Sequence, residues 1–405
     1  MLFIKKLKSK KAVMKVIVFF VYLYGSVYLF SNDLPLPNWV DSEREKKVVD
    51  SFPQVSLQAY PSSDFRTPAE YEAVYAVIVS YIGYTTMIKE IAKAVSNYAN
   101  AYVWVMSGPS SINGVSSDKY VNFPIPIDSV WVRDYGPFSI SKQSQSVAII
   151  DMVYRHYQYR KNDDAVPSKI GQIQKLMVYP VSLILDGGNF MVDSKGNLFM
   201  TERTYMWNSS KPKEEVNNIL KNYFKVKNIY SFEYAGYPNE PVDGTGHIDM
   251  FMKLLSDDTV VIADCDVEPF KTTFEKAVEF FKNKTSPNGN KYKILRVKSY
   301  YKNGVYYTYT NSLIVNGNVI MPVYSNYPQS NSDAKSVYES AGFRVITVNS
   351  DASISSGGAI HCVTQTVPDI GRIIEKLEIE TVKPVDLVIN PFDDIINIWK
   401  YNFAR

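Results

Sequence analysis

Short apolar runs alternate with amphipathic segments along most of the chain. Residues 74–79 (VYAVIV) and 102–106 (YVWVM) are continuous apolar runs, which are typical of buried strands. Between them, residues 85–100 carry apolar side chains at the spacing of a helix with one buried face. The same pattern, with start and stop signals, predicts helices over three later segments, namely residues 213–224, 268–282 and 332–341. This alternation of strands and helices predicts an α/β fold.

Tight turns within the apolar pattern add hairpins to this prediction. Asn316-Gly317 lies between two apolar runs, which is the strongest short signal for a hairpin. Residues 193–196 (DSKG) and 256–258 (SDD) lie in similar positions between apolar runs. Such hairpins argue against a purely parallel sheet, because parallel strands need long crossover connections.

Aligning the turns shows a repeating unit. Each unit begins with a cluster of small and polar residues, continues with a strand, a turn and a second strand, and usually ends with a helix and a strand. Successive clusters are 55, 58, 64 and 51 residues apart when one residue marks each of them: Asp134, Asn189, His247, Asn311 and Cys362. Five units of similar length predict a closed ring of ββαβ blades, with the polar clusters converging near its axis.

The N-terminus has the charge pattern of an export signal. Six lysines up to Lys15 precede the uncharged run of residues 16–30, which predicts a signal peptide or a signal-anchor helix over residues 1–33; a buried core helix is the alternative. Because lysines stay on the cytoplasmic side, the body would be extracytoplasmic or at the cell surface, in the secretory pathway, with the membrane as a partner. Residues 34–64, rich in Pro, Ser and charge, are predicted to be a stem or linker. The tail, residues 372–405, is expected to pack on the body or on another copy in a homo-oligomer.

Composition and charge narrow the class of protein. With 46% hydrophobic and 21% charged residues, the chain of 405 residues is globular rather than disordered. Its net charge of +3 is too small to indicate a nucleic-acid partner. Two cysteines cannot form a disulfide framework, and only three histidines are available for any histidine-dependent chemistry.

Cys362 is the first candidate for that chemistry. It follows a Ser-Gly-rich stretch and precedes an apolar strand, so it is either a small buried residue or an activated nucleophile. His247 and Asp249, two positions apart on a predicted strand, would point to the same side, where the anion raises the basicity of the imidazole; a hydrogen-bonded core pair is the alternative. The remaining Cys265 and His361 are interpreted as structural.

A second carboxylate indicates what such a site would bind. Asp134 ends a short apolar run before a Gly-Pro turn. In one dry site Asp134 and Asp249 would repel each other unless a cation lay between them, and a planar guanidinium donates two-pronged hydrogen bonds to carboxylates. A cysteine, a histidine and two carboxylates therefore indicate attack on the carbon of a guanidinium. A metal is not expected, because no set of cysteines and histidines has the spacing of zinc ligands.

Four blocks carry a resemblance to a known family: WVRDYGPF (131–138), DGGNFMVDSKG (186–196), GTGHIDMF (244–251) and SGGAIHCVTQTVPD (356–369). Together with the opening segment FRTPAEYE (65–72), they resemble the bacterial-type peptidylarginine deiminase and agmatine deiminase family, in the same order. The resemblance covers a catalytic domain over residues 65–371. It implies the pentein fold, a five-bladed α/β propeller, and hydrolysis of a guanidine without a cofactor.

The resemblance also implies roles for single residues. Cys362 matches the nucleophile and His247 the general acid/base, while Asp134 and Asp249 match the carboxylates that hold the guanidinium. Trp131 would pack on the aliphatic stem of the substrate. Further residues are expected to line the substrate site: Gly246, Ile248 and Asn311.

Two arginines are further candidates for substrate binding. The peptidylarginine branch of the family holds the carboxylate of a C-terminal arginine with two arginines in an R-x-R pattern. Here Arg155 and Arg160 are present at a different spacing, so a preference for C-terminal arginine does not follow. The alternative for both is a solvated cationic face.

The leading functional expectation is hydrolytic deimination of peptidyl-arginine or free arginine to citrulline and ammonia, through a covalent cysteine thiouronium. An agmatine deiminase, which would give N-carbamoylputrescine and ammonia, is the nearest alternative. An amidinotransferase would share the same residues but admit an amine instead of water. From another class, the body could be an inactive binding module on a membrane anchor.

Overall fold

The computed structural model describes residues 34–54, 59–142, 146–237 and 240–370. The predicted signal or anchor helix over residues 1–33 and the predicted tail over residues 372–405 lie outside the described residues. Within the described ranges, no helix combines the length and the apolarity that a bilayer crossing requires.

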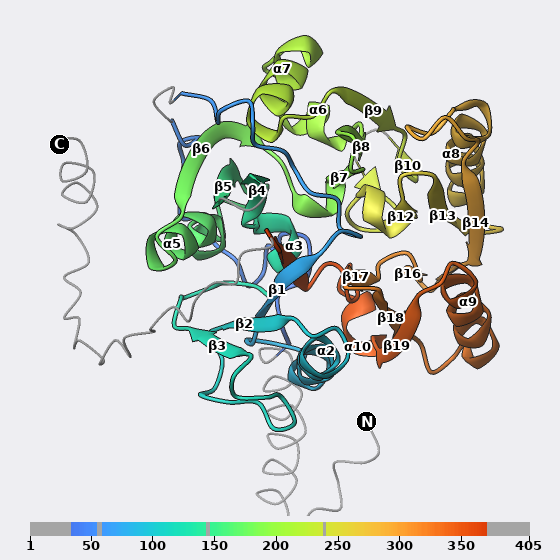
Figure 1. The fold of residues 1–405 in the computed structure, drawn as a ribbon, viewed down its shortest axis with the longest axis horizontal. Coiled ribbons are helices and arrows are strands. Elements are labelled where there is room, and N and C mark those ends of the chain that lie inside the picture. The colour runs from blue at the N-terminus through green and yellow to red at the C-terminus, as the bar shows by residue number, and fades with distance from the viewer. Residues whose placement is uncertain (1–33, 55–58, 143–145, 238–239, 371–405) are drawn as a thin grey trace, which may run out of the picture. The chain divides into compact units, whose positions relative to one another are not determined.

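Five sheets share one pattern of connection and surround a common centre, with helices on the outside (Figure 1). In each sheet a strand pairs antiparallel with a second strand, which pairs parallel with a third. A helix connects the second strand to the third, as right-handed crossovers between parallel strands require. The predicted ring of ββαβ blades is therefore present in the described chain.

The first two blades contain the start of the chain's body. The first consists of β20 (Thr364–Pro368), β1 (Val74–Ser80), α2 (Thr85–Asn97), β2 (Tyr102–Met106) and an additional strand β3 (Tyr120–Phe123). The second consists of β4 (Phe138–Lys142), β5 (Ser146–Val153), α5 (Val166–Ile173) and β6 (Met177–Ile184). Because β20 pairs with β1, the end of the described chain closes the ring on its first strand.

The other three blades repeat the pattern. The third consists of β7 (Met191–Val192), β8 (Asn197–Thr201), α7 (Lys213–Phe224) and β9 (Asn228–Phe232). The fourth consists of β12 (Met252–Ser256), β13 (Thr259–Asp264), α8 (Phe270–Asn283) and β14 (Lys293–Lys298). The fifth consists of β17 (Leu313–Val315), β18 (Asn318–Val323), α9 (Pro328–Ser340) and β19 (Arg344–Asn349).

Short elements connect the blades. The connecting strands form two ribbons: β10 (Gly236–Tyr237) with β11 (Glu240–Pro241), and β15 (Tyr300–Lys302) with β16 (Val305–Tyr307). The short helices are α3 (Val132–Tyr135), α4 (Lys161–Asp164), η2 (Gly187–Asn189), α6 (Arg203–Trp207), η3 (Ile248–Met250) and α10 (Asp351–Ile354). Of these, α3, η2 and η3 lie directly before the first strands of their blades, so the chain turns sharply just where a blade begins.

The local predictions are confirmed where the sequence has clear signals. The predicted helix over residues 213–224 coincides with α7, and the Asn316-Gly317 turn joins β17 to β18. The predicted helix over residues 85–100 ends three residues earlier, at Asn97, and Asn100 adopts a left-handed conformation (φ 54°) that excludes it from the helix.

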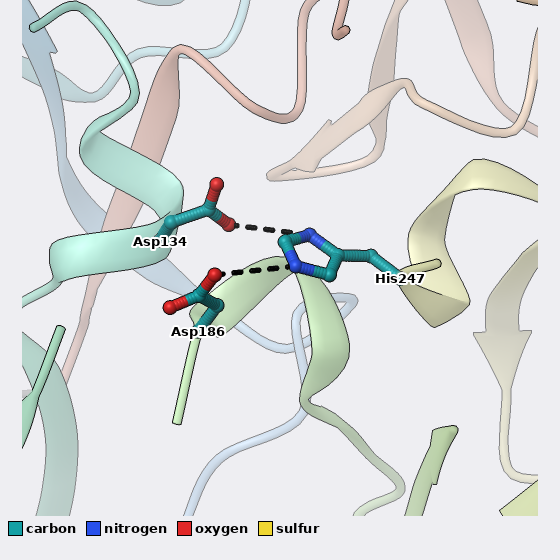
Figure 2. A group of neighbouring side chains, drawn as sticks. All are labelled: Asp134, Asp186 and His247. Atoms are coloured by element: carbon teal, nitrogen blue, oxygen red, sulfur yellow. Dashed lines mark ion pairs between the residues drawn. The ribbon is translucent and has the colours of Figure 1, made fainter. Parts of the chain in front are cut away.

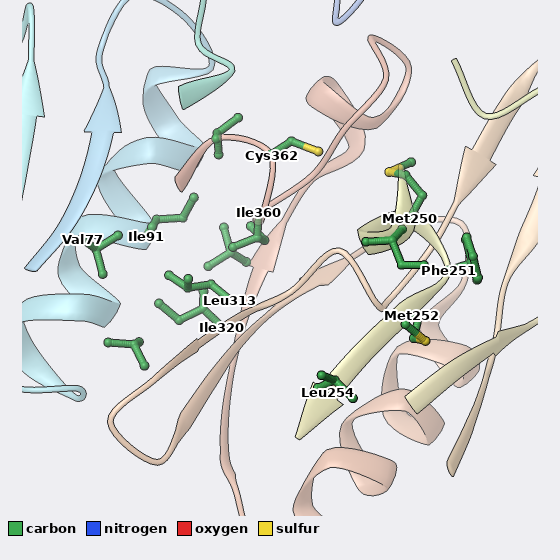
Figure 3. Packing of buried hydrophobic residues seen from close by; sticks show 14 of the residues in the cluster. Val77, Ile91, Met250, Phe251, Met252, Leu254, Leu313, Ile320, Ile360 and Cys362 are labelled. Carbon is green, nitrogen blue, oxygen red and sulfur yellow. The ribbon is translucent and has the colours of Figure 1, made fainter. Parts of the chain in front are cut away.

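The apolar faces of the blades pack against the helices. Figure 3 shows one such group, the cluster that includes Val77 of β1, Ile91 of α2 and Leu313 of β17 together with Cys362. These side chains are fully buried. Cys362 is therefore held at the border between an apolar core and the polar centre of the ring, where a backbone shift would be opposed by close packing.

The segment predicted as a stem differs from an open linker. We call residues 34–45 the strap; they lie against the body, and Asn38 within them is fully buried. Farther along, the amide of Val48 donates to the carbonyl of Gln158. The sequence composition favoured a linker because prolines and charges dominate this stretch, but its backbone carbonyls and Asn38 find partners on the body.

Candidate active site

The loops that precede the first strands of all five blades meet at the centre of the ring. Each brings one or two polar side chains, so residues that are far apart in the sequence become neighbours. The loops contribute the following residues, in blade order: Cys362, Asp134, Asp186 with Gly188, His247 with Asp249, and Asn311. All of these side chains are buried, so charges among them interact with little screening by water.

Cys362 lies beside a carboxylate and an amide. Its Sγ is 3.9 Å from Oδ2 of Asp249 and accepts a hydrogen bond from Nδ2 of Asn311 at 3.1 Å. Asn311 also donates to Oδ2 of Asp249 (3.1 Å), while its Oδ1 accepts from the amides of Ala359 (2.9 Å) and Cys362 (3.3 Å). Asn311 thus fixes the sulfur relative to the carboxylate through four contacts.

His247 lies between two carboxylates (Figure 2). Its Nδ1 is 3.5 Å from Oδ1 of Asp134 and its Nε2 is 3.3 Å from Oδ2 of Asp186. Burial opposes protonation of the imidazole, but Asp134 and Asp186 outweigh burial and raise the pKa of His247 above its usual value. The two carboxylates therefore favour the protonated form of this imidazole.

Gly188 allows these groups to approach one another. A Cβ atom added there would lie 2.5 Å from Nδ1 of His247, 2.8 Å from Oδ1 of Asp134 and 3.2 Å from Oδ2 of Asp249. The amide of Gly188 donates to Oδ1 of Asp134 at 3.0 Å. The site consequently requires glycine here, because any side chain would occupy the space on which the three polar groups converge.

Burial and the neighbouring carboxylates oppose ionisation of the thiol. Burial raises the pKa of the Cys362 thiol well above its usual value, and the nearby carboxylates Asp249 and Asp134 raise it further. Burial also raises the pKa of Asp134, despite the opposing effect of His247. Among the described residues, Oδ1 of Asp249 has no hydrogen-bond donor. The site thus combines a buried thiol, whose ionisation is opposed, with a carboxylate oxygen that no described residue contacts as a donor, and a cation would complement both.

Asp186 is a site residue that the sequence reasoning missed. Burial would raise its pKa, but Arg155 and His247 outweigh this effect and lower it. Arg155 pairs with it through Nε at 3.1 Å and stacks its guanidinium over Trp207, with Cζ 5.3 Å from the ring centroid. The position of Asp186 directly before Gly187-Gly188 was the available signal, because carboxylates often precede turns with close backbone approach.

His361 is held by two carboxylates. Its Nδ1 is 2.6 Å from Oδ2 of Asp249 and its Nε2 is 2.5 Å from Oε2 of Glu70, in the opening segment. Glu70 also contacts Lys253 (2.9 Å) and Arg133 (3.2 Å). These contacts hold Asp249 through its Oδ2 and leave Oδ1 on the other side. His361 therefore has a structural role, as predicted, and that role is to position a residue of the site.

The other predicted site residues are placed as follows. Trp131 is buried, and its Nε1 donates to the carbonyl of Leu36. Gly358 lies between Trp131 and Cys362, since a Cβ added there would lie 2.8 Å from the Trp131 ring and 2.7 Å from Sγ of Cys362. The amide of Ile248 donates to Asn189, and the carbonyl of Gly246 accepts from Thr201, so their backbones hold the loop that carries His247. These contacts fix the loop; contacts of Trp131, Gly246 and Ile248 with a substrate stay a prediction.

Two local expectations need correction. His247 and Asp249 do not lie on a strand, because Ile248–Met250 forms the 3₁₀ turn η3, which directs the two side chains to different partners around one centre. Arg155 and Arg160 do not lie on a solvated face either. Arg160 is fully buried and binds the strap: it donates to Glu45 (2.6 Å) and to the carbonyls of Pro37 (2.9 Å) and Trp39 (2.7 Å).

A cation site could be considered at Asp134, Asp186 and His247, whose donor atoms lie within 4.8 Å of one another. The imidazole, however, lies between the two carboxylates and presents a different nitrogen to each. A single metal ion needs one free nitrogen pointing at the same point as the carboxylate oxygens. This geometry favours a protonated imidazole instead, with Arg155 as the second positive charge.

Comparisons with known proteins show which family this chain is similar to. The model of the Porphyromonas-type peptidyl-arginine deiminase family matches residues 63–368. A protein of Photobacterium profundum that is provisionally named agmatine deiminase is 23% identical over 78% of this chain and 99% of its own length. A similarly named protein of Marinomonas sp. is 26% identical over 60% of this chain and 75% of its own. The solved agmatine deiminase of Enterococcus faecalis superposes with a TM-score of 0.67 at 20% identity, covering 78% of this chain and 100% of that one.

The fold likeness shows a pentein-type α/β architecture, and the family model covers most of the described chain, including every residue of the buried cluster. This chain belongs to the Porphyromonas-type peptidyl-arginine deiminase family.

Proposed function

We propose that this chain, a hydrolase of amidine carbon–nitrogen bonds, acts on small guanidines such as agmatine, which it would convert to N-carbamoylputrescine and ammonia. One observation carries the proposal: a sulfur, an imidazole and two carboxylates from three separate blades meet in one buried cluster, namely Cys362, His247, Asp134 and Asp249. The names of the relatives add support for agmatine, since several are named agmatine deiminases.

Binding of the guanidinium would switch on the nucleophile. In the free site burial and the two carboxylates keep Cys362 as a neutral thiol. A guanidinium that donates to Asp134 and Asp249 cancels their charge and places a positive charge beside Sγ, so the thiol loses its proton to solvent only when substrate is bound. The thiolate then attacks the guanidinium carbon, and a carbon–sulfur bond forms.

His247 would carry the protons of both half-reactions. Its proton goes to the departing amino group, which leaves as ammonia when the carbon–nitrogen bond breaks, and a covalent thiouronium remains on Cys362. The neutral imidazole then takes a proton from water, whose oxygen bonds to the same carbon. The carbon–sulfur bond breaks, the remaining hydroxyl proton returns to the sulfur of Cys362, and the neutral ureido product leaves. Proton transfer of this kind contributes roughly 10²–10⁴-fold to the rate.

A small substrate is favoured by the surroundings of the cluster. The catalytic side chains have no exposed surface, and the strap lies over them. Arg155, the nearest candidate to hold a substrate carboxylate, already pairs with Asp186, so a carboxylate would have to compete with a buried anion. Agmatine has no carboxylate and avoids this competition.

Peptidyl-arginine or free arginine is the second candidate, because the matching family model is named for peptidyl-arginine. The purified full chain should be incubated with agmatine, arginine and a peptide ending in arginine, while ammonia and ureido product are measured. We expect the highest kcat/KM with agmatine. A higher value with the peptide would select the second candidate instead.

A pair of cysteine variants tests the chemistry itself. Cys362→Ala should abolish ammonia release, whereas Cys265→Ala, at the other free cysteine, should retain it. Retained turnover in Cys362→Ala, or no ammonia from any guanidine with the unmodified chain, would refute the proposed function.

A further inference from the structure

The strap, residues 34–45, lies outside residues 63–368, which the family model matches, yet it reaches the centre of the site. Nδ2 of Asn38 donates to Oδ2 of Asp134 at 2.9 Å, and Asn38 has no exposed surface. Oδ1 of Asp134 already accepts from the amide of Gly188. Both oxygens of the carboxylate are therefore occupied, one of them by a residue that is separated from it by 96 positions.

The body holds this part of the strap by its backbone. The amide of Asn38 donates to the carbonyl of Ser356 at 2.7 Å, and its carbonyl accepts from Arg155 at 2.9 Å. Nε1 of Trp131 donates to the carbonyl of Leu36 at 2.8 Å. These three hydrogen bonds fix the main chain that carries Asn38. The side-chain amide of Asn38 is therefore held in place by specific contacts with the body.

The ring of Trp39 covers two glycines beside the site. A Cβ added to Gly357 would lie 3.1 Å from the ring, and one added to Gly244 would lie 3.3 Å from it. Both glycines have positive φ values, 97° and 90°, and stand at the loops that carry Cys362 and His247. Trp39 itself remains 41% exposed. It lies over these loops with one face toward solvent.

We propose that the strap is a built-in occupant of the guanidine site, with the Asn38 amide in the place of one substrate amino group. This inference rests on the proposed function and adds the determinant of its substrate range. A guanidinium, like the Asn38 amide, donates an N–H group to the carboxylate of Asp134. Because the guanidinium is charged and the amide is not, a guanidinium that reaches Asp134 displaces the Asn38 amide. The strap therefore weakens binding of every guanidine and, while in place, excludes an arginine embedded in a protein.

Kinetics of strap variants in the full-length chain test this inference. Asn38→Ala removes the competing donor and Trp39→Ala loosens the cover, while Glu43→Gln changes an exposed position of the same strap and serves as the control. We expect the KM for agmatine to fall about tenfold in Asn38→Ala with kcat unchanged, the value of one hydrogen bond to a charged group. Turnover of an internal arginine in a peptide should rise in both test variants but not in Glu43→Gln. A KM that rises in Asn38→Ala, or that does not change, would overturn the inference, since Asn38 would then support substrate or be irrelevant to it.

Alkylation gives a second measurement that needs no turnover. Iodoacetamide labelling of Cys362 can be followed by mass spectrometry in the same sample as Cys265, which is also buried and lies far from the strap in sequence. Labelling of Cys362 should accelerate in Asn38→Ala and Trp39→Ala, with Cys265 unchanged. Equal rates in all variants would refute the strap as a cover. If no guanidine is hydrolysed but labelling accelerates, the proposed function fails and the covering role stands.

Discussion

Asp249→Asn should make Cys362 more reactive toward a neutral reagent and, at the same time, make the enzyme slower on its cationic substrate. The substitution removes one negative charge without changing the size of the side chain. Because Asp249 raises the pKa of the thiol, its loss lowers that pKa and increases the thiolate fraction at any pH below it. The same change removes an anionic acceptor for the guanidinium.

The structure gives the size of both effects. Two unit charges separated by the 3.9 Å between Sγ and Oδ2 repel by about 4 kcal/mol at an effective dielectric constant near 20. This energy corresponds to a roughly thousandfold larger thiolate fraction. A thiolate of lower pKa is also a weaker nucleophile, which cancels about half of the gain in the logarithm of the rate, so alkylation should be on the order of 30-fold faster. Removing one partner of a buried ion pair should lower kcat/KM by roughly 100-fold or more.

The assay compares rates of iodoacetamide modification at neutral pH, resolved by peptide for Cys362 and Cys265, with ammonia release from agmatine. Asp266→Asn, which removes an exposed carboxylate beside Cys265, is the matched control and should leave Cys362 unchanged. If Asp249→Asn left alkylation of Cys362 unchanged or slower, the two carboxylates would not be what keeps the thiol neutral, and the substrate-assisted activation argued above would be refuted.

Three further outcomes are expected. Gly188→Ala should abolish turnover and lower the thermal stability, because the added methyl group would lie 2.5 Å from His247 Nδ1 and buried groups would have to shift; measurable activity would contradict the close approach. Asp186→Asn should shift the alkaline limb of the kcat/KM–pH profile to lower pH, because Asp134 and Asp186 together outweigh burial in raising the pKa of His247 and the variant loses one of them; an unchanged limb would assign it to another group. Glu70→Gln should destabilise the fold by about 3 kcal/mol in urea unfolding above pH 5, because Lys253 would lose a buried partner. Burial opposes the ionised form of Glu70, but His361 and Lys253 outweigh burial and lower the pKa of Glu70. The difference in stability between the two proteins should therefore shrink as the pH falls through that lowered pKa.

The blades could be predicted from the sequence because each repeats strong local signals. The helix over residues 213–224 has an apolar face and a defined start, and the Asn316-Gly317 turn fixes a hairpin wherever it occurs. The spacing of the five polar clusters then indicates a ring, since equal units that each bury one face must stack or close. The candidate nucleophile and imidazole could be narrowed down because the sequence has only two cysteines and three histidines, and the resemblance then indicated Cys362 and His247.

The remainder of the site depends on contacts that no local pattern records. Asn38 lies in a segment whose prolines and charges resemble a linker. Its burial depends on Arg160, which holds the strap through Glu45, a residue 115 positions away in the sequence. Asp186 gained its role only when the third blade brought it beside His247. The placement of His247 and Asp249 was derived from strand geometry, but a 3₁₀ turn over Ile248–Met250 produces their convergence.

The closure of the ring also determines when the protein becomes competent during its synthesis. A growing chain on the ribosome contains the imidazole and all the carboxylates of the centre before residue 362 emerges, and β1 keeps an open edge until Thr364–Pro368 pairs with it. The sulfur is therefore delivered together with the strand that locks the circle. With Cys362 as the proposed nucleophile, a translation product that stops before this residue lacks the attacking sulfur, so the order of synthesis separates incomplete copies from active ones.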